Sequence, residues 1–272
     1  MDAYAGIDVA FAKRKTLPIV VCVRRDGRLE PLSLRRGAAP QPPRGQGNVK
    51  TLDPTVLAEF AEETVRYLRA VEVRFGVSIV RVGIDAPSDP STDLEPRRKA
   101  ELALDQRRIS CFTTPSDQKF REIRVKVENH LVGGGAVARM PHANQLWMLV
   151  GFELFRRLRL EWECLEVFPQ ATVALLGVGG VHKTRDGGIE SQLAAVARFT
   201  GWPTPPLPKA LAQAGYGRLH DCLDAYLAAW VASLDLNARE PLGCPPNDVI
   251  WVPRLAGTGS PLILDGAKVH LP

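Results

Sequence analysis

Short apolar runs that each carry one acidic residue are the most regular feature of the hydrophobic pattern. The run 4–10 is apolar except for Asp8, the run 80–87 repeats its Gly-Ile-Asp triplet at Asp85, and a third run carries Glu166. Continuous apolar runs of this length are typical of buried strands. An ionised carboxylate in such a strand is costly unless a cation or hydrogen bonds compensate it. Three such acids on three predicted strands therefore require a chemical explanation.

The first half of the chain has the signals of an antiparallel meander followed by a helix and a further strand. Asp26-Gly27 is a strong hairpin-turn signal between two apolar runs. Asp53 followed by Pro54 is typical of a helix start, and apolar residues continue at helical spacing as far as Gly76. The predicted order is β-β-β-α-β, with strands at 4–10, 17–23, 29–34 and 78–85 and the helix at 54–75.

The remainder of the chain is mainly helical. We interpret residues 95–160 as a helical insertion packed beside the sheet, within a single domain of residues 1–256 that is followed by a tail at 257–272. Inside the insertion we expect a basic helix at 96–107, a short strand at 109–113, a helix capped by Ser116 and an amphipathic helix at 144–160. After the Glu166 strand we expect helices at 189–200 and 219–234 and a final strand at 248–253.

The predicted helix 219–234 contributes two more acids. Asp221 and Asp224 are three residues apart, so they point to the same side of the helix. Four alanines at 225, 228, 229 and 232 would let this helix approach a sheet closely. For Asp221 alone, a simple favourable interaction with the helix dipole is an alternative. That alternative does not explain the strand acids as well.

A set of acids on separate elements indicates a divalent-metal site. Carboxylate oxygens are the ligands that Mg²⁺ and Mn²⁺ prefer. Two such ions about 4 Å apart can activate water and stabilise the leaving oxygen when a phosphodiester is cleaved. We therefore predict that Mg²⁺ or Mn²⁺ is bound, and that the catalytic and metal-binding residues are Asp8, Asp85, Glu166, Asp221 and Asp224.

Several ordered motifs resemble the domain-of-unknown-function 429 family, whose members are predicted nucleases of the ribonuclease H-like fold. The motifs are Gly6-Ile7-Asp8, Gly83-Ile84-Asp85-Ala86-Pro87, Arg98-x-x-Glu101-x-x-Leu104, Leu165-Glu166-Val167-Phe168-Pro169, His182-Lys183 and His220-Asp221-x-x-Asp224-Ala225. The Asp221-x-x-Asp224 pair also resembles the last-helix acids of Holliday-junction resolvases. The resemblance implies a mixed α/β sheet, an antiparallel three-strand meander followed by parallel strands, with helices on both faces.

Basic residues outside the acidic set are candidates for binding substrate. Lys183 lies in a glycine-rich segment and either brings a cation to a phosphate or is an exposed loop lysine. Arg98, Arg121 and Arg124 lie on predicted basic helices that either follow a nucleic-acid backbone or form a solvated face. A net charge of +5 mildly favours polyanionic partners.

Composition restricts the class of protein further. Hydrophobic residues make up 45% of the 272 residues, as in ordinary globular proteins, and no apolar run approaches the roughly 20 residues that span a bilayer. Five cysteines with no Cys-x-x-Cys pair argue against a disulfide framework or a zinc knuckle. We therefore expect a cytoplasmic protein with no membrane association.

The sequence thus favours a metal-dependent nuclease that acts on a nucleic acid by a two-metal mechanism. One alternative is an actin-like ATPase or a related kinase, which shares the strand topology. Such proteins usually have glycine-rich phosphate loops after their strands, whereas Asp8 is followed by Val9-Ala10-Phe11-Ala12. A second alternative is a non-catalytic module of the same fold that binds nucleic acid or another partner.

Overall fold

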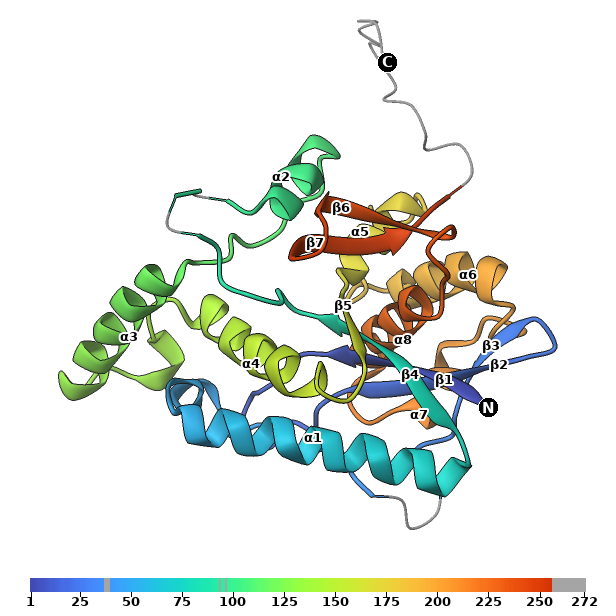
Figure 1. Ribbon diagram of the computed structural model, residues 1–272, viewed down its shortest axis with the longest axis horizontal. Coiled ribbons are helices and arrows are strands. Elements are labelled where there is room, and N and C mark those ends of the chain that lie inside the picture. The colour runs from blue at the N-terminus through green and yellow to red at the C-terminus, as the bar shows by residue number, and fades with distance from the viewer. Residues whose placement is uncertain (37–39, 93, 96, 256–272) are drawn as a thin grey trace, which may run out of the picture.

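Five strands form one mixed sheet at the centre of the computed structural model (Figure 1). The structure describes residues 1–36, 40–92, 94–95 and 97–255. The strands are β1 (Asp2–Asp8), β2 (Ile19–Arg25), β3 (Arg28–Pro31), β4 (Ser78–Asp85) and β5 (Glu163–Glu166). Their order is β3-β2-β1-β4-β5, in which β1 runs antiparallel to β2 and parallel to β4, and β4 runs parallel to β5. The predicted meander followed by parallel strands is confirmed.

The part of the chain that the structure describes contains eight α-helices and three short 3-10 helices. The α-helices are α1 (Pro54–Phe75), α2 (Lys99–Gln106), α3 (Asp117–Val132), α4 (Ala143–Leu158), α5 (Pro169–Leu175), α6 (Gly188–Thr200), α7 (Leu211–Ala214) and α8 (Leu219–Ala232). The 3-10 helices are η1 (Asn48–Leu52), η2 (Val137–Arg139) and η3 (Pro208–Ala210). None of the described helices is both long and apolar enough to cross a membrane.

Helix α1 begins and ends where its sequence signals predict. The Asp53 carboxylate accepts hydrogen bonds from the backbone N–H groups of Thr55 and Val56, at 3.1 and 3.4 Å. Gly76 then takes the left-handed conformation, with φ of 63°, that commonly closes a helix.

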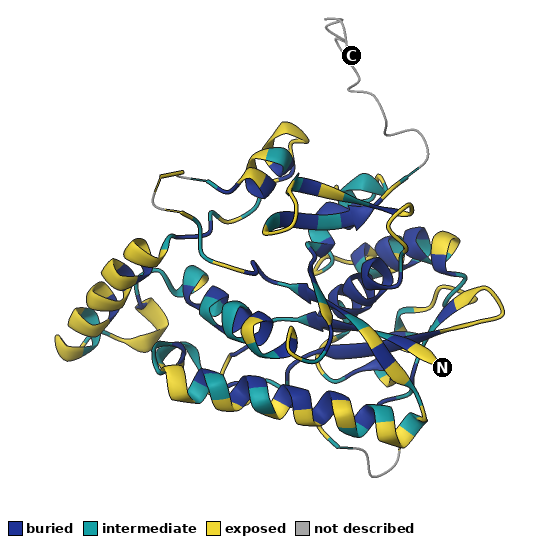
Figure 2. Cartoon of the chain, viewed as in Figure 1, coloured by how far each residue is buried: buried dark blue, intermediate teal, exposed yellow. Residues whose placement is uncertain are grey.

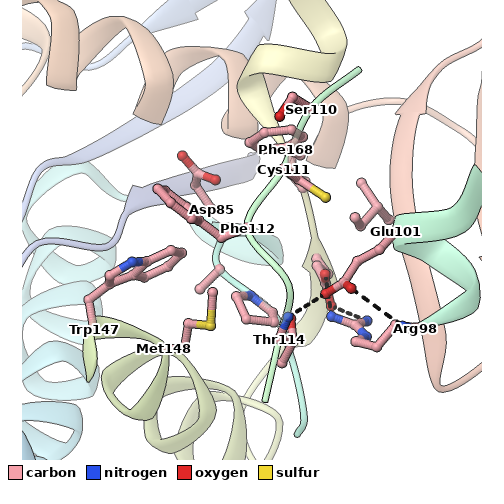
Figure 3. Close-up of a pocket in the computed structure, with 15 residues that line it drawn as sticks. Asp85, Arg98, Glu101, Ser110, Cys111, Phe112, Thr114, Trp147, Met148 and Phe168 are labelled. Carbon is pink, nitrogen blue, oxygen red and sulfur yellow. Dashed lines mark hydrogen bonds and ion pairs between the residues drawn. The ribbon is translucent and has the colours of Figure 1, made fainter. Parts of the chain in front are cut away.

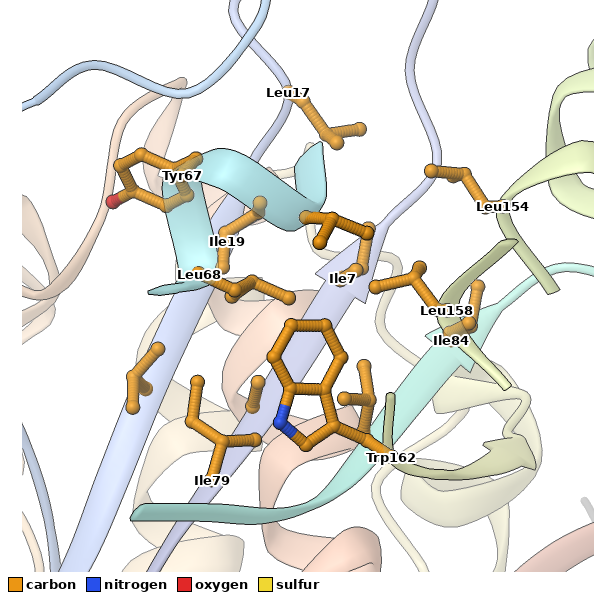
Figure 4. Close-up of a cluster of buried hydrophobic side chains, with 14 of the residues drawn as sticks. Ile7, Leu17, Ile19, Tyr67, Leu68, Ile79, Ile84, Leu154, Leu158 and Trp162 are labelled. Atoms are coloured by element: carbon orange, nitrogen blue, oxygen red, sulfur yellow. The ribbon is translucent and has the colours of Figure 1, made fainter. Parts of the chain in front are cut away.

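The two faces of the sheet bury different residues of the same strands. Ala5 and Ile7 of β1 belong to the apolar cluster with α1 and α4, and Figure 4 shows Ile7 in that cluster beside Leu68 and Leu158. The intervening Gly6 lies against α8 on the opposite face. This alternation is the period of two that a strand requires. Helices therefore cover both faces of the sheet, as predicted.

The predicted insertion forms helices, but they do not pack as one unit beside the sheet. Helix α4 packs on α1, whereas α2 packs on a hairpin of β6 (Arg239–Cys244) and β7 (Asp248–Pro253). The hydrophobic pattern predicts only the second strand of this hairpin. Helix α3 begins at the predicted cap, where Ser116 Oγ accepts the backbone N–H of Lys119 at 3.3 Å.

Two expectations for the insertion require correction, and two expectations for the end of the chain lie outside the described residues. Residues 109–113 do not form a strand, and at the end of this segment the N–H of Thr114 donates to buried Glu101 at 2.8 Å. The predicted basic helix at 96–107 begins at Lys99. The predicted tail at 257–272 and the end of the predicted domain at 256 lie outside the described residues.

Candidate metal centre

The two Gly-Ile-Asp triplets lie side by side in the sheet. In the parallel pairing of β1 with β4, Gly6 pairs with Gly83 and Asp8 pairs with Asp85. Both strands end at these acids, so the two carboxylates lie at the same edge of the sheet. Because each Asp is two residues after its glycine, both side chains lie on the face that α8 covers.

Glycines on the strands bring α8 unusually close to this face. A Cβ built at Gly6 would lie 1.9 Å from the carbonyl oxygen of Ala225, and one at Gly83 would lie 2.3 Å from that of Ala228. The backbone of α8 therefore lies directly on β1 and β4. This approach places Asp224, one residue before Ala225, beside the two strand acids.

Three carboxylates from three elements converge at this point. One oxygen each of Asp8, Asp85 and Asp224 lie within 4.8 Å of one another, and Asp224 is buried. The structure therefore brings together three of the five predicted metal-binding acids. Oxygen atoms at this spacing can ligate a common cation of the Mg²⁺ or Mn²⁺ type.

A lysine compensates part of the negative charge. The Lys183 ammonium forms an ion pair with the Asp224 carboxylate, and only 23% of the Lys183 side chain is exposed. The loop before α6 thus carries Lys183 into the acidic group, in contrast to the alternative that it is an exposed loop residue. Asp224 and Lys183 lie 41 residues apart in the sequence, so nothing local predicts this pairing.

The electrostatics of the site raise the pKa of both strand acids when no metal is bound. Burial raises the pKa of Asp8 to about 6, and Lys183 acts against this while Asp221 adds to it. Burial, followed by repulsion from Asp8, raises the pKa of Asp85 to about 8. Since the two carboxyls interact, they titrate as a pair.

The metal-free protein is therefore expected to lose stability as the pH rises. A folded-state pKa above the unfolded value of 3.8 stabilises the fold below that value, and this contribution is lost as the pH passes through about 6 and about 8. In chelator, the free energy of unfolding at pH 8.5 should be lower than at pH 5.5 by about 1 kcal/mol or more. Denaturant titrations at both pH values measure it.

The double variant Asp8→Asn/Asp85→Asn provides the control for this pH dependence. Other groups titrate in the same range, so only the difference between the parent and the variant reports on the two acids. The stability of the variant should vary less between the two pH values. Equal pH dependence of parent and variant would contradict the raised pKa values.

Asp221 lies beside the three acids but has other partners. Its carboxylate accepts the Lys15 ammonium at 3.0 Å and the backbone N–H of Arg218 at 3.2 Å, and His220 Nε2 lies 3.4 Å away. It also lies within hydrogen-bonding reach of Asp8. Asp221 therefore caps the first turn of α8 and borders the site at the same time.

Glu166 lies on the other face of the sheet. Its pairing partner on β4 is Ile84, which faces α1 and α4, whereas its neighbours Leu165 and Val167 pack against α8. The alternation of a strand therefore turns Glu166 away from Asp224. Glu166 is thereby separated from the other four predicted acids, because its side chain lies on the opposite face of the sheet.

Buried partners occupy both carboxylate oxygens of Glu166. Arg98 donates to them through Nη1 and Nη2, each at 2.8 Å, and the backbone N–H of Ser88 donates to Oε2 at 2.8 Å. Arg98 Nε also donates to Asp248 at 3.1 Å. Arg98, for which the sequence predicts a contact with substrate, is instead only 5% exposed and engaged by two carboxylates.

The variant Glu166→Gln is expected to lose about 3 kcal/mol of stability. Removing one partner of a buried ion pair leaves the other charge undercompensated, because Arg98 keeps only the partly exposed Asp248 and an arginine cannot release its proton. Burial raises the pKa of the Glu166 carboxyl while Arg98 and Ser88 act against this rise. Chemical denaturation in chelator measures the loss. An unchanged free energy of unfolding would show that the pair contributes nothing net.

The other two predicted substrate-binding residues lie apart from the acids. Arg121 and Arg124 are exposed on α3, which projects from the body of the molecule and is exposed along much of its length (Figure 2). Sequence reasoning did not select Lys15 or Asp248. Lys15 had a usable signal, because it lies in a basic turn shortly after Asp8, whereas no local pattern identifies Asp248 as the partner of Arg98.

The fold and the acidic group define a mixed α/β protein with a candidate divalent-cation site at one edge of its sheet. Residues 6–248 match the family described as "Protein of unknown function (DUF429)", and the chain belongs to this family. The predicted family membership is thereby confirmed, and the family description assigns no activity. No curated protein and no solved structure matches the chain.

Proposed function

We propose that the chain is a divalent-metal-dependent nuclease that cleaves phosphodiester bonds. The observation that carries this proposal is the convergence of Asp8, Asp85 and Asp224 within 4.8 Å. Carboxylates this close repel one another, so a fold that holds them together without a further role would be weakened. A cation-binding role explains why three separate elements each supply one carboxylate to the same point.

The residues present fit Mg²⁺ or Mn²⁺. All three donors are carboxylate oxygens, which hard divalent cations prefer, and the Lys183 ammonium is already seated among them as a positive charge. Asp8, Asp85 and Asp224 would hold the first ion, and Asp221, next to Asp8, would complete a second position. When bound, such ions supply an activated water and stabilise the leaving oxygen.

The protein's own groups have separate tasks in this proposal. The strand acids fix the position of the reacting phosphate, because their backbones are paired in the centre of the sheet. Lys183, released from Asp224 when the acids take up cations, would reach a phosphate oxygen as a flexible point charge. Lys15, paired with Asp221, lies near enough to assist in neutralising the same anion. Arg121 and Arg124 would follow the nucleic-acid backbone further away.

A cleavage screen tests the proposal. Labelled single-stranded, duplex and branched DNA and RNA are incubated with the protein in Mg²⁺, Mn²⁺ or chelator. At least one substrate should be cut only with metal, and Asp8→Asn should lower that rate by about 100-fold or more. The matched control is Asp235→Asn, the same change at an exposed acid, which should cut at the parent rate. If no substrate is cleaved, or if Asp8→Asn and Asp235→Asn cleave at the same rate, the proposed nuclease function is rejected.

A further inference from the structure

A cavity of about 230 Å³ lies immediately beside the acidic group. Asp85 is part of its wall, so the cavity and the candidate metal centre share a side chain. Its other walls come from elements that close over the end of β4: the segment 110–114, helix α4, and the residues that follow β5.

Aromatic side chains form much of this wall. Phe112, Trp147 and Phe168 line the cavity together with Met148, and Figure 3 shows Phe112 and Trp147 close to Asp85 at one end of it. Phe112 is 57% exposed, and neither Trp147 nor Phe168 is fully buried. Aromatic faces left accessible in this way can stack on a planar ring.

The charged residues of the wall, Asp85 aside, are already paired. Arg98 binds Glu166 and Asp248, and Glu101 accepts the backbone N–H groups of Arg98 and Thr114 (Figure 3). Apart from Asp85, the cavity therefore offers apolar and aromatic surface and no free charge for an ionic group. Its volume is below the 300 Å³ or so of a typical small-molecule pocket, which suits a single ring system.

The Glu101 contact also fixes the segment that carries Phe112. Its Oε1 accepts the N–H of Thr114 at 2.8 Å, and Glu101 itself is only 2% exposed. This anchor lies two residues after Phe112 and holds the segment against α2. The exposed ring of Phe112 is thus presented on a fixed backbone.

We propose that this cavity binds one unpaired nucleobase of the substrate, next to the phosphate that is cleaved. The assignment rests on the proposed nuclease function, because a phosphate at Asp85 would place its attached nucleoside at the cavity mouth. A base stacked inside a duplex cannot enter such a cavity, so the substrate must be single-stranded there or have a base turned out of the helix. Stacking is indifferent to base identity, so little sequence preference is expected.

Fluorescence quenching of 2-aminopurine deoxyriboside, measured without metal, tests the cavity separately from catalysis. Saturable quenching is expected, and Phe112→Ala and Trp147→Ala should each weaken binding about tenfold. Trp147→Phe keeps a ring and should retain most of the affinity. The control is Phe199→Ala, which removes another exposed ring, on α6, and should bind as the parent does. Melting curves establish that each variant is folded.

The 5′-monophosphate of the same nucleoside tests the metal centre. With Mn²⁺ it should bind more tightly than the nucleoside, and Asp8→Asn should abolish this gain while leaving nucleoside binding unchanged. If the nucleoside does not bind saturably, or if Phe112→Ala and Trp147→Ala bind it as the parent does, the cavity assignment is overturned. A monophosphate that gains nothing from Mn²⁺ would instead count against the nuclease, so the two failures are distinguishable.

Discussion

In chelator at pH 8, the Asp85→Asn variant is expected to be at least as stable as the parent protein. Burial and repulsion from Asp8 raise the pKa of Asp85 to about 8. Ionising this carboxyl at pH 8 therefore costs free energy in the folded protein. Asparagine removes the charge with little change in volume. Most substitutions of buried residues destabilise by about 1 kcal/mol, so a neutral or stabilising result would be distinctive.

Addition of metal should reverse this order. A ligand that binds only the folded protein stabilises it by about 2.7 kcal/mol at a hundredfold excess over its dissociation constant. The parent should gain about this much from Mn²⁺, and Asp85→Asn should lose most of the gain because it lacks one of three clustered ligands. Thermal melts with chelator and with Mn²⁺ give all four values.

Glu166→Gln is the matched comparison for these melts. It is the same acid-to-amide change at the end of the neighbouring strand, but Glu166 is held by Arg98 and Ser88. It should destabilise the metal-free protein and leave the response to Mn²⁺ intact. If Asp85→Asn behaves as Glu166→Gln does, Asp85 is a structural residue and the metal centre is rejected.

Local signals predicted the parts of the fold in which a few neighbouring residues determine the structure. The Asp26-Gly27 turn connects β2 and β3, and Asp53 caps α1. The repeated Gly-Ile-Asp triplet predicted equivalent positions on two strands, and the pairing of Asp8 with Asp85 agrees with it. The small residues of α8 predicted close packing on the sheet, which Gly6 and Gly83 permit.

Features that depend on pairing between distant segments were not predictable in this way. The face on which Glu166 lies depends on the register of β5 against β4, and a shift of one residue would reverse it. Its partner Arg98 is 68 residues away, and helices α6, η3 and α7 lie between Lys183 and Asp224 in the sequence. Hairpin strand β6 lacks a clear apolar pattern, since Pro241 and Gly243 interrupt it.

Replacement of Gly6 by alanine is expected to destabilise the protein by about 3 kcal/mol or more and to dismantle the acidic group. The new Cβ would lie 1.9 Å from the Ala225 oxygen and 2.3 Å from the Ala229 nitrogen. Both are backbone atoms of α8, so no side-chain rotation can relieve the overlap, and the helix must move away from the sheet.

Because Asp224 precedes Ala225 on that helix, the movement would also withdraw its carboxylate from Asp8. Any variant that stays folded should therefore respond to Mn²⁺ much less than the parent. The matched control is Gly180→Ala, where a Cβ meets no atom within 4 Å and the backbone is not in the left-handed region. Chemical denaturation of both variants, each with and without Mn²⁺, measures the two effects. Equal stability of Gly6→Ala and the parent would show that α8 does not lie as close to β1 as the acidic group requires.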